Sequence, residues 1–80
     1  MSYNYSTITS QEKFNIISSQ IKSFEIQHYR NSLSLIEMNA VLLKDLVGIE
    51  NLINENLDIE KKISMLNIEL DSVSKLLPEL

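Results

Sequence analysis

Apolar residues recur at alternating intervals of three and four along most of the chain, the spacing of a helix face that packs against another helix. The first run of such positions is Phe14, Ile17, Ile21, Phe24, His28, Asn31, Leu35, Met38 and Leu42. The second run is Ile49, Leu52, Asn56, Ile59, Ile63, Leu66, Leu70, Val73, Leu77 and Leu80. These two seams predict two amphipathic α-helices.

The first helix has a recognisable start. Thr9-Ser10-Gln11-Glu12 fits a capping box, in which the Thr9 hydroxyl accepts from the Glu12 amide and the Glu12 carboxylate accepts from the Thr9 amide. We therefore predict an extended arm over residues 1–8 and a helix over residues 9–46.

Gly48 is the single glycine and lies just past the first seam. A glycine tolerates the left-handed conformation that often follows a helix, so a turn is predicted over residues 44–50. The second helix is then expected over residues 51–77, ended by Pro78. The alternative is one unbroken helix through Gly48, since one glycine costs only about 1 kcal/mol there.

Folding the chain at this turn gives an all-α, coiled-coil-like antiparallel two-helix hairpin. In the register that this turn suggests, Leu42 faces Leu52 and Asn31 faces Ile63, so nearly every level has a large apolar member. Asn56 also lies in the seam. It either penalises wrong registers, as buried asparagines do in coiled coils, or is solvated near the turn.

A second apolar stripe lies on another side of the first helix. Its predicted contact residues are Tyr29, Leu33, Ile36, Ala40 and Leu43. Further apolar residues lie outside the seam of the second helix: Ile53, Leu57, Met65, Ile68 and Leu76. A hairpin cannot cover both sets, so we expect self-association, most simply a dimer that completes a four-helix bundle.

Composition narrows the classes of function. The chain has 80 residues, a net charge of −4 and no cysteine, which excludes disulfides and thiolate metal sites. Its basic residues are scattered, so nucleic-acid binding is not expected. No apolar run approaches the roughly 18 residues of a membrane span, and no secretory signal pattern is present, so no membrane partner is expected and the location is expected to be cytoplasmic.

One pattern of ligand-type residues occurs. Glu25 and His28 form Glu-x-x-His, the spacing used by carboxylate-bridged di-iron bundles, and Glu69 is expected near the same level of the second helix. A dimer would double this set. The competing interpretation is a hydrogen-bonded seam histidine with solvated glutamates, and on that interpretation the protein has no metal and no cofactor.

The N-terminal stretch MSYNYSTITSQEKFNIISSQIKSFEIQHY resembles the start of small proteins of unknown function from marine tailed phages, especially cyanophages. The shared features are the Ser2, Tyr3 and Tyr5 opening, the Thr9 cap and an isoleucine-rich run. The resemblance covers about the first third of the chain. It implies a phage-encoded protein that acts in the host cytoplasm or in a virion.

The sequence therefore predicts a non-enzymatic, self-associating assembly or adaptor module. Two alternatives remain open: a dimeric carboxylate–histidine metal protein, and an antagonist that binds a host protein through the same apolar stripes. The arm with Tyr3 and Tyr5 either packs loosely on the helices or docks on a partner.

Overall fold

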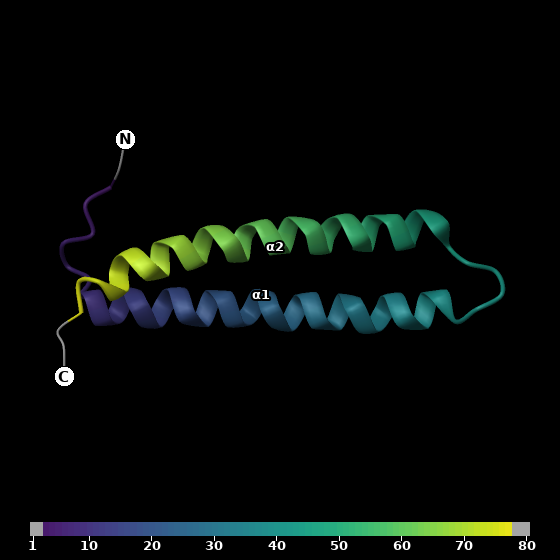
Figure 1. Ribbon diagram of the computed structural model, residues 1–80, viewed down its shortest axis with the longest axis horizontal. Coiled ribbons are helices and arrows are strands. Elements are labelled where there is room, and N and C mark those ends of the chain that lie inside the picture. The colour runs from purple at the N-terminus through teal and green to yellow at the C-terminus, as the bar shows by residue number, and fades with distance from the viewer. Residues whose placement is uncertain (1–2, 78–80) are drawn as a thin grey trace.

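Two long helices make up most of the chain. The computed structural model describes residues 3–77, so the predictions that fall on Ser2, Pro78 and Leu80 lie outside it. Helix α1 spans Ser10–Asn39 and helix α2 spans Leu46–Ser74. They lie antiparallel and side by side, with the connecting loop at one end (Figure 1). The predicted all-α helical hairpin is confirmed.

The predicted capping box at the start of α1 is confirmed. The Glu12 amide donates to Thr9 Oγ1 at 3.0 Å, and the Thr9 amide donates to Glu12 Oε1 at 3.0 Å. Two hydrogen bonds with Thr9 lower the pKa of Glu12. The bond from the Thr9 backbone has the larger effect and the bond with the Thr9 side chain the smaller one. The stabilisation from this carboxylate is therefore present above its unfolded-state pKa and is lost as the pH falls through the lowered folded-state pKa.

The turn lies earlier than the sequence pattern indicated. Helix α1 ends at Asn39 instead of residue 46, and α2 begins at Leu46 instead of residue 51. The reason is an N-cap: the Asp45 carboxylate accepts from the Gly48 amide at 2.9 Å and starts α2 there.

Gly48 consequently belongs to the first turn of α2, and its predicted role after the first helix is wrong. No glycine among residues 3–77 has a positive φ. Its lack of a side chain serves close packing, because a Cβ at this position would collide with the Asp45 carboxylate and lie 3.0 Å from the Met38 methyl group. The glycine thus lets the cap close.

The interface between the helices follows the predicted seam. Its most buried apolar side chains are Ile21, Ile49, Ile59 and Val73. Asn31 and Asn56 are also buried. The other described seam residues are partly buried, with Leu42 as the exception. Leu42 is fully exposed in the loop, so the predicted Leu42–Leu52 contact is wrong.

The register differs from the expected one by one heptad. Asn31 Nδ2 donates to Asn56 Oδ1 at 2.9 Å, so Asn31 faces Asn56 and not Ile63. The expected register would have buried each asparagine against an apolar residue, with its amide unsatisfied. The observed register pairs the two amides, which supports the interpretation that Asn56 specifies the register.

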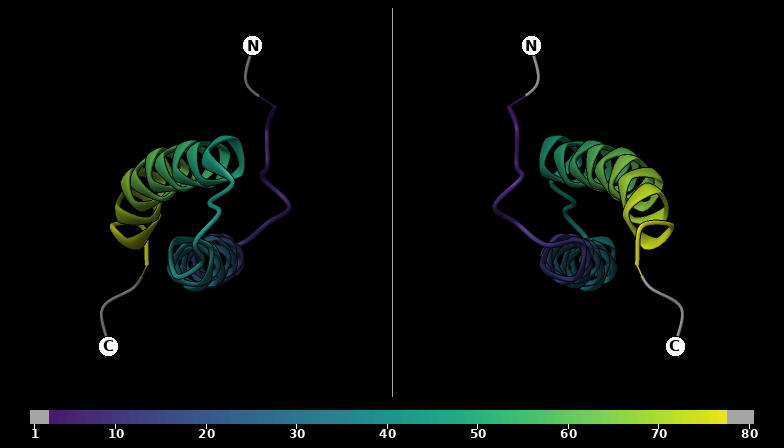
Figure 2. Two further views of the ribbon diagram at one scale, coloured as in Figure 1. Left: turned by 90° about the vertical axis from the view of Figure 1, so that its right-hand side faces the viewer. Right: turned by 90° about the vertical axis from the view of Figure 1, so that its left-hand side faces the viewer.

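The hairpin is thin and elongated. Its extents are 55 × 32 × 16 Å and its radius of gyration is 17.5 Å, whereas a compact domain of this length would have about 12 Å. Viewed from its ends, α2 curves over α1 as the two helices coil (Figure 2). Neither helix has the length and apolar character needed to span a membrane, as far as residues 3–77 show.

The ends of the hairpin also depart from the prediction. In the arm, the Ile8 amide donates to the Tyr5 carbonyl at 3.0 Å, which closes a turn in the segment expected to be extended. The Tyr3 and Tyr5 rings lie 5.0 Å apart and are both exposed. Helix α2 ends at Ser74 instead of residue 77, and short-range bonds such as Leu77 amide to Ser74 carbonyl at 3.3 Å follow it.

We predict that the two seam asparagines are energetically coupled. Asn56→Leu should destabilise the hairpin, since it leaves the buried Asn31 amide without its acceptor, at a cost of about 1–3 kcal/mol. Adding Asn31→Leu removes the orphaned group and should recover most of this loss. Urea unfolding of the two single variants and the double variant measures the coupling, with Asn51→Leu on the exposed side of α2 as control. Strictly additive effects would contradict the prediction.

Candidate functional site

The polar layer at the middle of the seam is saturated by its own hydrogen bonds. Asn31 and Asn56 are only 5% and 6% exposed. Besides their mutual bond, Asn31 Oδ1 accepts from Gln27 Nε2 at 2.9 Å, and Asn56 Nδ2 donates to the His28 carbonyl at 3.3 Å. No buried side-chain polar atom among the described residues lacks a partner. This layer specifies packing and leaves no polar group free for a ligand.

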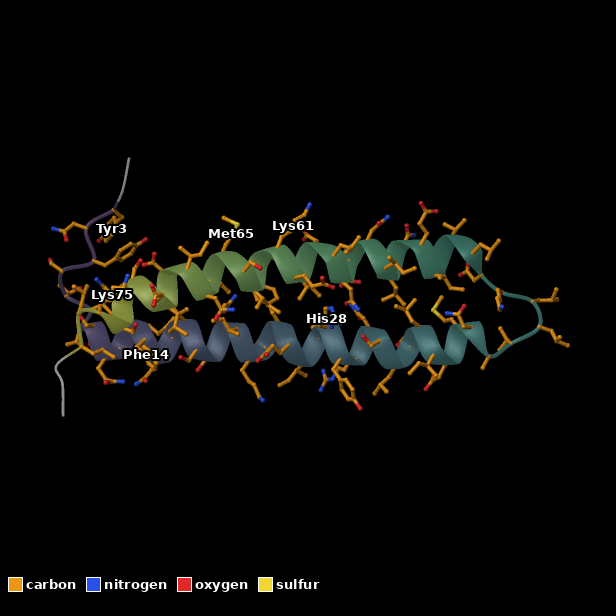
Figure 3. The ribbon with its side chains drawn as sticks, in the orientation of Figure 1. Tyr3, Phe14, His28, Lys61, Met65 and Lys75 are labelled. Atoms are coloured by element: carbon orange, nitrogen blue, oxygen red, sulfur yellow. The ribbon has the colours of Figure 1, made fainter. Side chains whose placement is uncertain are left out.

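His28 lies beside this layer, between the helices (Figure 3). Its Nε2 is 2.9 Å from Glu60 Oε2 across the interface. Glu60 was not among the predicted site residues, because only the shifted register brings it to the level of His28. His28, Glu60, Glu25 and Ile63 line a shallow hollow on one side of the hairpin.

The predicted set Glu25, His28 and Glu69 is not brought together. Glu69 lies in another groove, with Ile17 and Lys13, because the register moves it towards the termini. Across residues 3–77 no group of three or more histidine, cysteine, aspartate or glutamate side chains is placed to hold a metal ion. His28 of the Glu-x-x-His pattern therefore pairs with Glu60 through one ring nitrogen, and the described residues do not complete a metal site around it.

The predicted contact stripe on α1 is exposed. Tyr29, Leu33 and Ile36 project from the helix, and Ile36 is 68% exposed. Ala40 is exposed at the end of α1, and Leu43 lies in the loop at 93% exposure. Tyr29 and Leu33 line a shallow groove along α1 together with Glu25. The helical period thus identified apolar surface that the hairpin leaves uncovered.

This surface continues across the hairpin onto α2. Glu25 lines both the α1 groove and the His28 hollow, while Glu60 lines both that hollow and a groove with Leu57 on α2. In an antiparallel pair, the heptad positions of Glu25 and Glu60 flank the seam on the same side. We call this side the lateral face. Its apolar members include Ile26, Tyr29, Leu33, Ile36, Ile53, Leu57 and Met65.

The chemistry of the lateral face is suited to binding. Exposed aliphatic and aromatic side chains lie beside two carboxylates, and burial of such side chains against another apolar surface is favourable. Glu60 and the α2 part of the face were missed from the sequence. The signal that could have found them is Asp45 before Leu46-Val47, an N-cap that starts α2 early and so shifts the register.

No protein-family model matches this chain, and searches of curated proteins and of solved structures find no match.

We predict that His28→Leu leaves the hairpin at least as stable as the natural protein. Leucine extends the apolar seam, and the Glu60 carboxylate that loses its partner is exposed and stays hydrated. The expected change is a melting temperature that is unchanged or raised by a few degrees, measured by circular dichroism. Glu60→Gln is the matched control and should change little. A large loss of stability from His28→Leu alone would show that the His28–Glu60 pair is structurally essential.

Proposed function

We propose that this protein is a non-enzymatic assembly or adaptor module, a helical hairpin that associates with a second copy of itself. The observation that supports this most is the amount of apolar surface that one hairpin leaves in water. The largest exposed apolar side chains lie on α1, on the loop and on α2, so the surplus is spread along the hairpin.

The total surface area shows how much more surface one hairpin exposes than a compact protein of the same mass. The chain exposes 6603 Å², whereas a compact folded protein of 9.2 kDa would expose about 4,900 Å². A typical stable dimer buries about 800 Å² on each partner. One interface of ordinary size would therefore remove a large part of the excess.

The stripe Tyr29, Leu33, Ile36, Ala40 and Leu43 is the proposed centre of this contact. Full burial of a large apolar side chain contributes roughly 1.5–3 kcal/mol. Several such side chains together offset much of the roughly 4–15 kcal/mol that association costs in lost translational and rotational freedom. The simplest product is a dimeric four-helix bundle.

The proposed origin and location come from the sequence. The resemblance of the N-terminal third to small phage proteins supports a phage-encoded protein that acts in the host cytoplasm or in a virion. A module without catalytic groups fits either place, because assembly needs only a surface and a partner.

We predict that charge placed on the stripe separates the copies. The natural protein should sediment at about twice 9.2 kDa at micromolar concentration, and Leu33→Lys with Ile36→Lys should shift it to the monomer mass or unfold it. The matched control is Gln20→Lys with Ser23→Lys, two exposed positions with the same spacing on another side of α1, which should stay dimeric.

Sedimentation equilibrium with circular dichroism on the same samples separates dissociation from unfolding. A folded natural protein of monomer mass would refute self-association. The exposed face would then need a different protein as its partner, which is the host-binding alternative.

A further inference from the structure

The tip of the hairpin is its most exposed apolar region. Leu42 and Leu43 are 102% and 93% exposed, and Leu46 and Val47 at the start of α2 are also exposed. Lys44 is the one charged residue among them before the Asp45 cap. Among the ion pairs of the described part of the chain, none involves Lys44.

The lateral face is more apolar in the half that adjoins this tip. Between the tip and the hollow lie Ile36, Ile53, Leu57 and Tyr29, together with one exposed carboxylate, that of Glu50. Beyond the hollow, towards the termini, Met65 and Ile68 are exposed and apolar, but most positions are polar or charged: Ser18, Lys22, Ser64, Asn67 and Asp71. The surface that favours association is therefore the tip and the adjoining half of the lateral face.

A parallel arrangement of two copies is unfavourable for this surface. With both tips at the same end, each residue of the lateral face lies opposite the same residue of the second copy. Glu25 and Glu60 would then approach the same two carboxylates of the second hairpin, and like charges brought together in a partly desolvated interface are destabilising.

An antiparallel arrangement with full overlap is also unfavourable. It would cover the apolar half of each lateral face with the polar half of the other, including Lys22 and Asp71, and would leave both tips in water.

An antiparallel overlap centred within the tip-proximal half joins the most apolar surface of the two copies. It brings one carboxylate, that of Glu50, close to its own copy, whereas the parallel arrangement does so for Glu25, Glu50 and Glu60. Ile36 and Ile53 lie near the middle of that half, so a twofold axis would pass close to them.

The same axis gives charge complementarity. Leu46, the first residue of α2, lies about 10 Å from Ile53 on the tip side at 1.5 Å per residue, and Lys44 lies in the loop two residues before it. Glu25 and His28 lie about 12–17 Å from Ile36 on the other side. The twofold rotation therefore brings Lys44 of one copy to the hollow of the other. That hollow presents the Glu25 and Glu60 carboxylates, both exposed and able to accept from an ammonium group.

We propose that the second copy docks antiparallel over the tip-proximal half of the lateral face, with Lys44 of each copy held by Glu25 and Glu60 of the other. This inference rests on the proposed self-association and specifies its geometry. Each hollow is completed by a residue of the partner copy, and the two identical contacts set the overlap of the hairpins.

Spin labels test the orientation. The protein contains no cysteine, so Asn15→Cys gives a single exposed labelling site far from the tip. The antiparallel overlap predicts about 60 Å between the two labels of a dimer, from twenty residues on each side of the axis at 1.5 Å per residue. A parallel dimer would give a separation on the order of 20 Å, set by the packing of neighbouring helices. A short distance in a protein that sediments as a dimer would overturn the orientation and leave self-association standing. A monomer would overturn both.

A charge exchange tests the Lys44 contact. Lys44→Glu should raise the dimer dissociation constant about three- to thirtyfold, since two exposed ion pairs are lost, and Glu25→Lys should act similarly. The double variant Lys44→Glu with Glu25→Lys restores opposite charges and should return to within about threefold of the natural value. Lys44→Glu with Glu37→Lys has the same net charge and should not recover. Equal affinities for both double variants, or no effect of Lys44→Glu, would overturn the contact.

Discussion

The hydrogen bond between Asn31 and Asn56 fixes how the two helices are aligned, and the other features of the hairpin depend on that alignment. Both amides are buried, so neither can turn to water if the helices slide. The alignment that joins them brings Glu60 to His28 and leaves the segment from Val41 to Leu43 beyond the ends of the helices. A single polar layer thus determines both the composition of the lateral face and the exposure of the tip.

Much of the fold was predictable, because its signals are local. The heptad pattern identified the face that each helix buries, and the Thr9 capping box marked the start of α1. Register is not local: sliding by one heptad exchanges one set of apolar partners for another of similar size. Among the seam residues, Asn31 and Asn56 distinguish the two registers. The turn was misplaced for a related reason, because Gly48 was interpreted as a residue that follows a helix when it admits the Asp45 cap.

The candidate site was likewise predictable only where its signals are local. The period of α1 identified the stripe through Leu33 and Ile36, because exposure on one helix follows from angle alone. The choice of Glu69 near His28 depended on register and was wrong, and the contact of Glu60 with His28 follows only from the arrangement of both helices. Two helices cannot enclose a core, so apolar surface remains outside the seam, and the proposed association rests on that surface.

The most direct test of this account is a measurement of the register itself. Since the natural chain has no cysteine, paired cysteines report on one contact at a time. In the alignment that joins the asparagines, Gln27 and Lys62 flank the seam as neighbours on the side opposite the lateral face. A short thiol-specific crosslinker should join Gln27→Cys to Lys62→Cys within one chain, as detected by mass spectrometry, and should fail to join Gln27→Cys to Glu69→Cys. Crosslinking of the second pair in preference to the first would place the helices one heptad away and contradict the account.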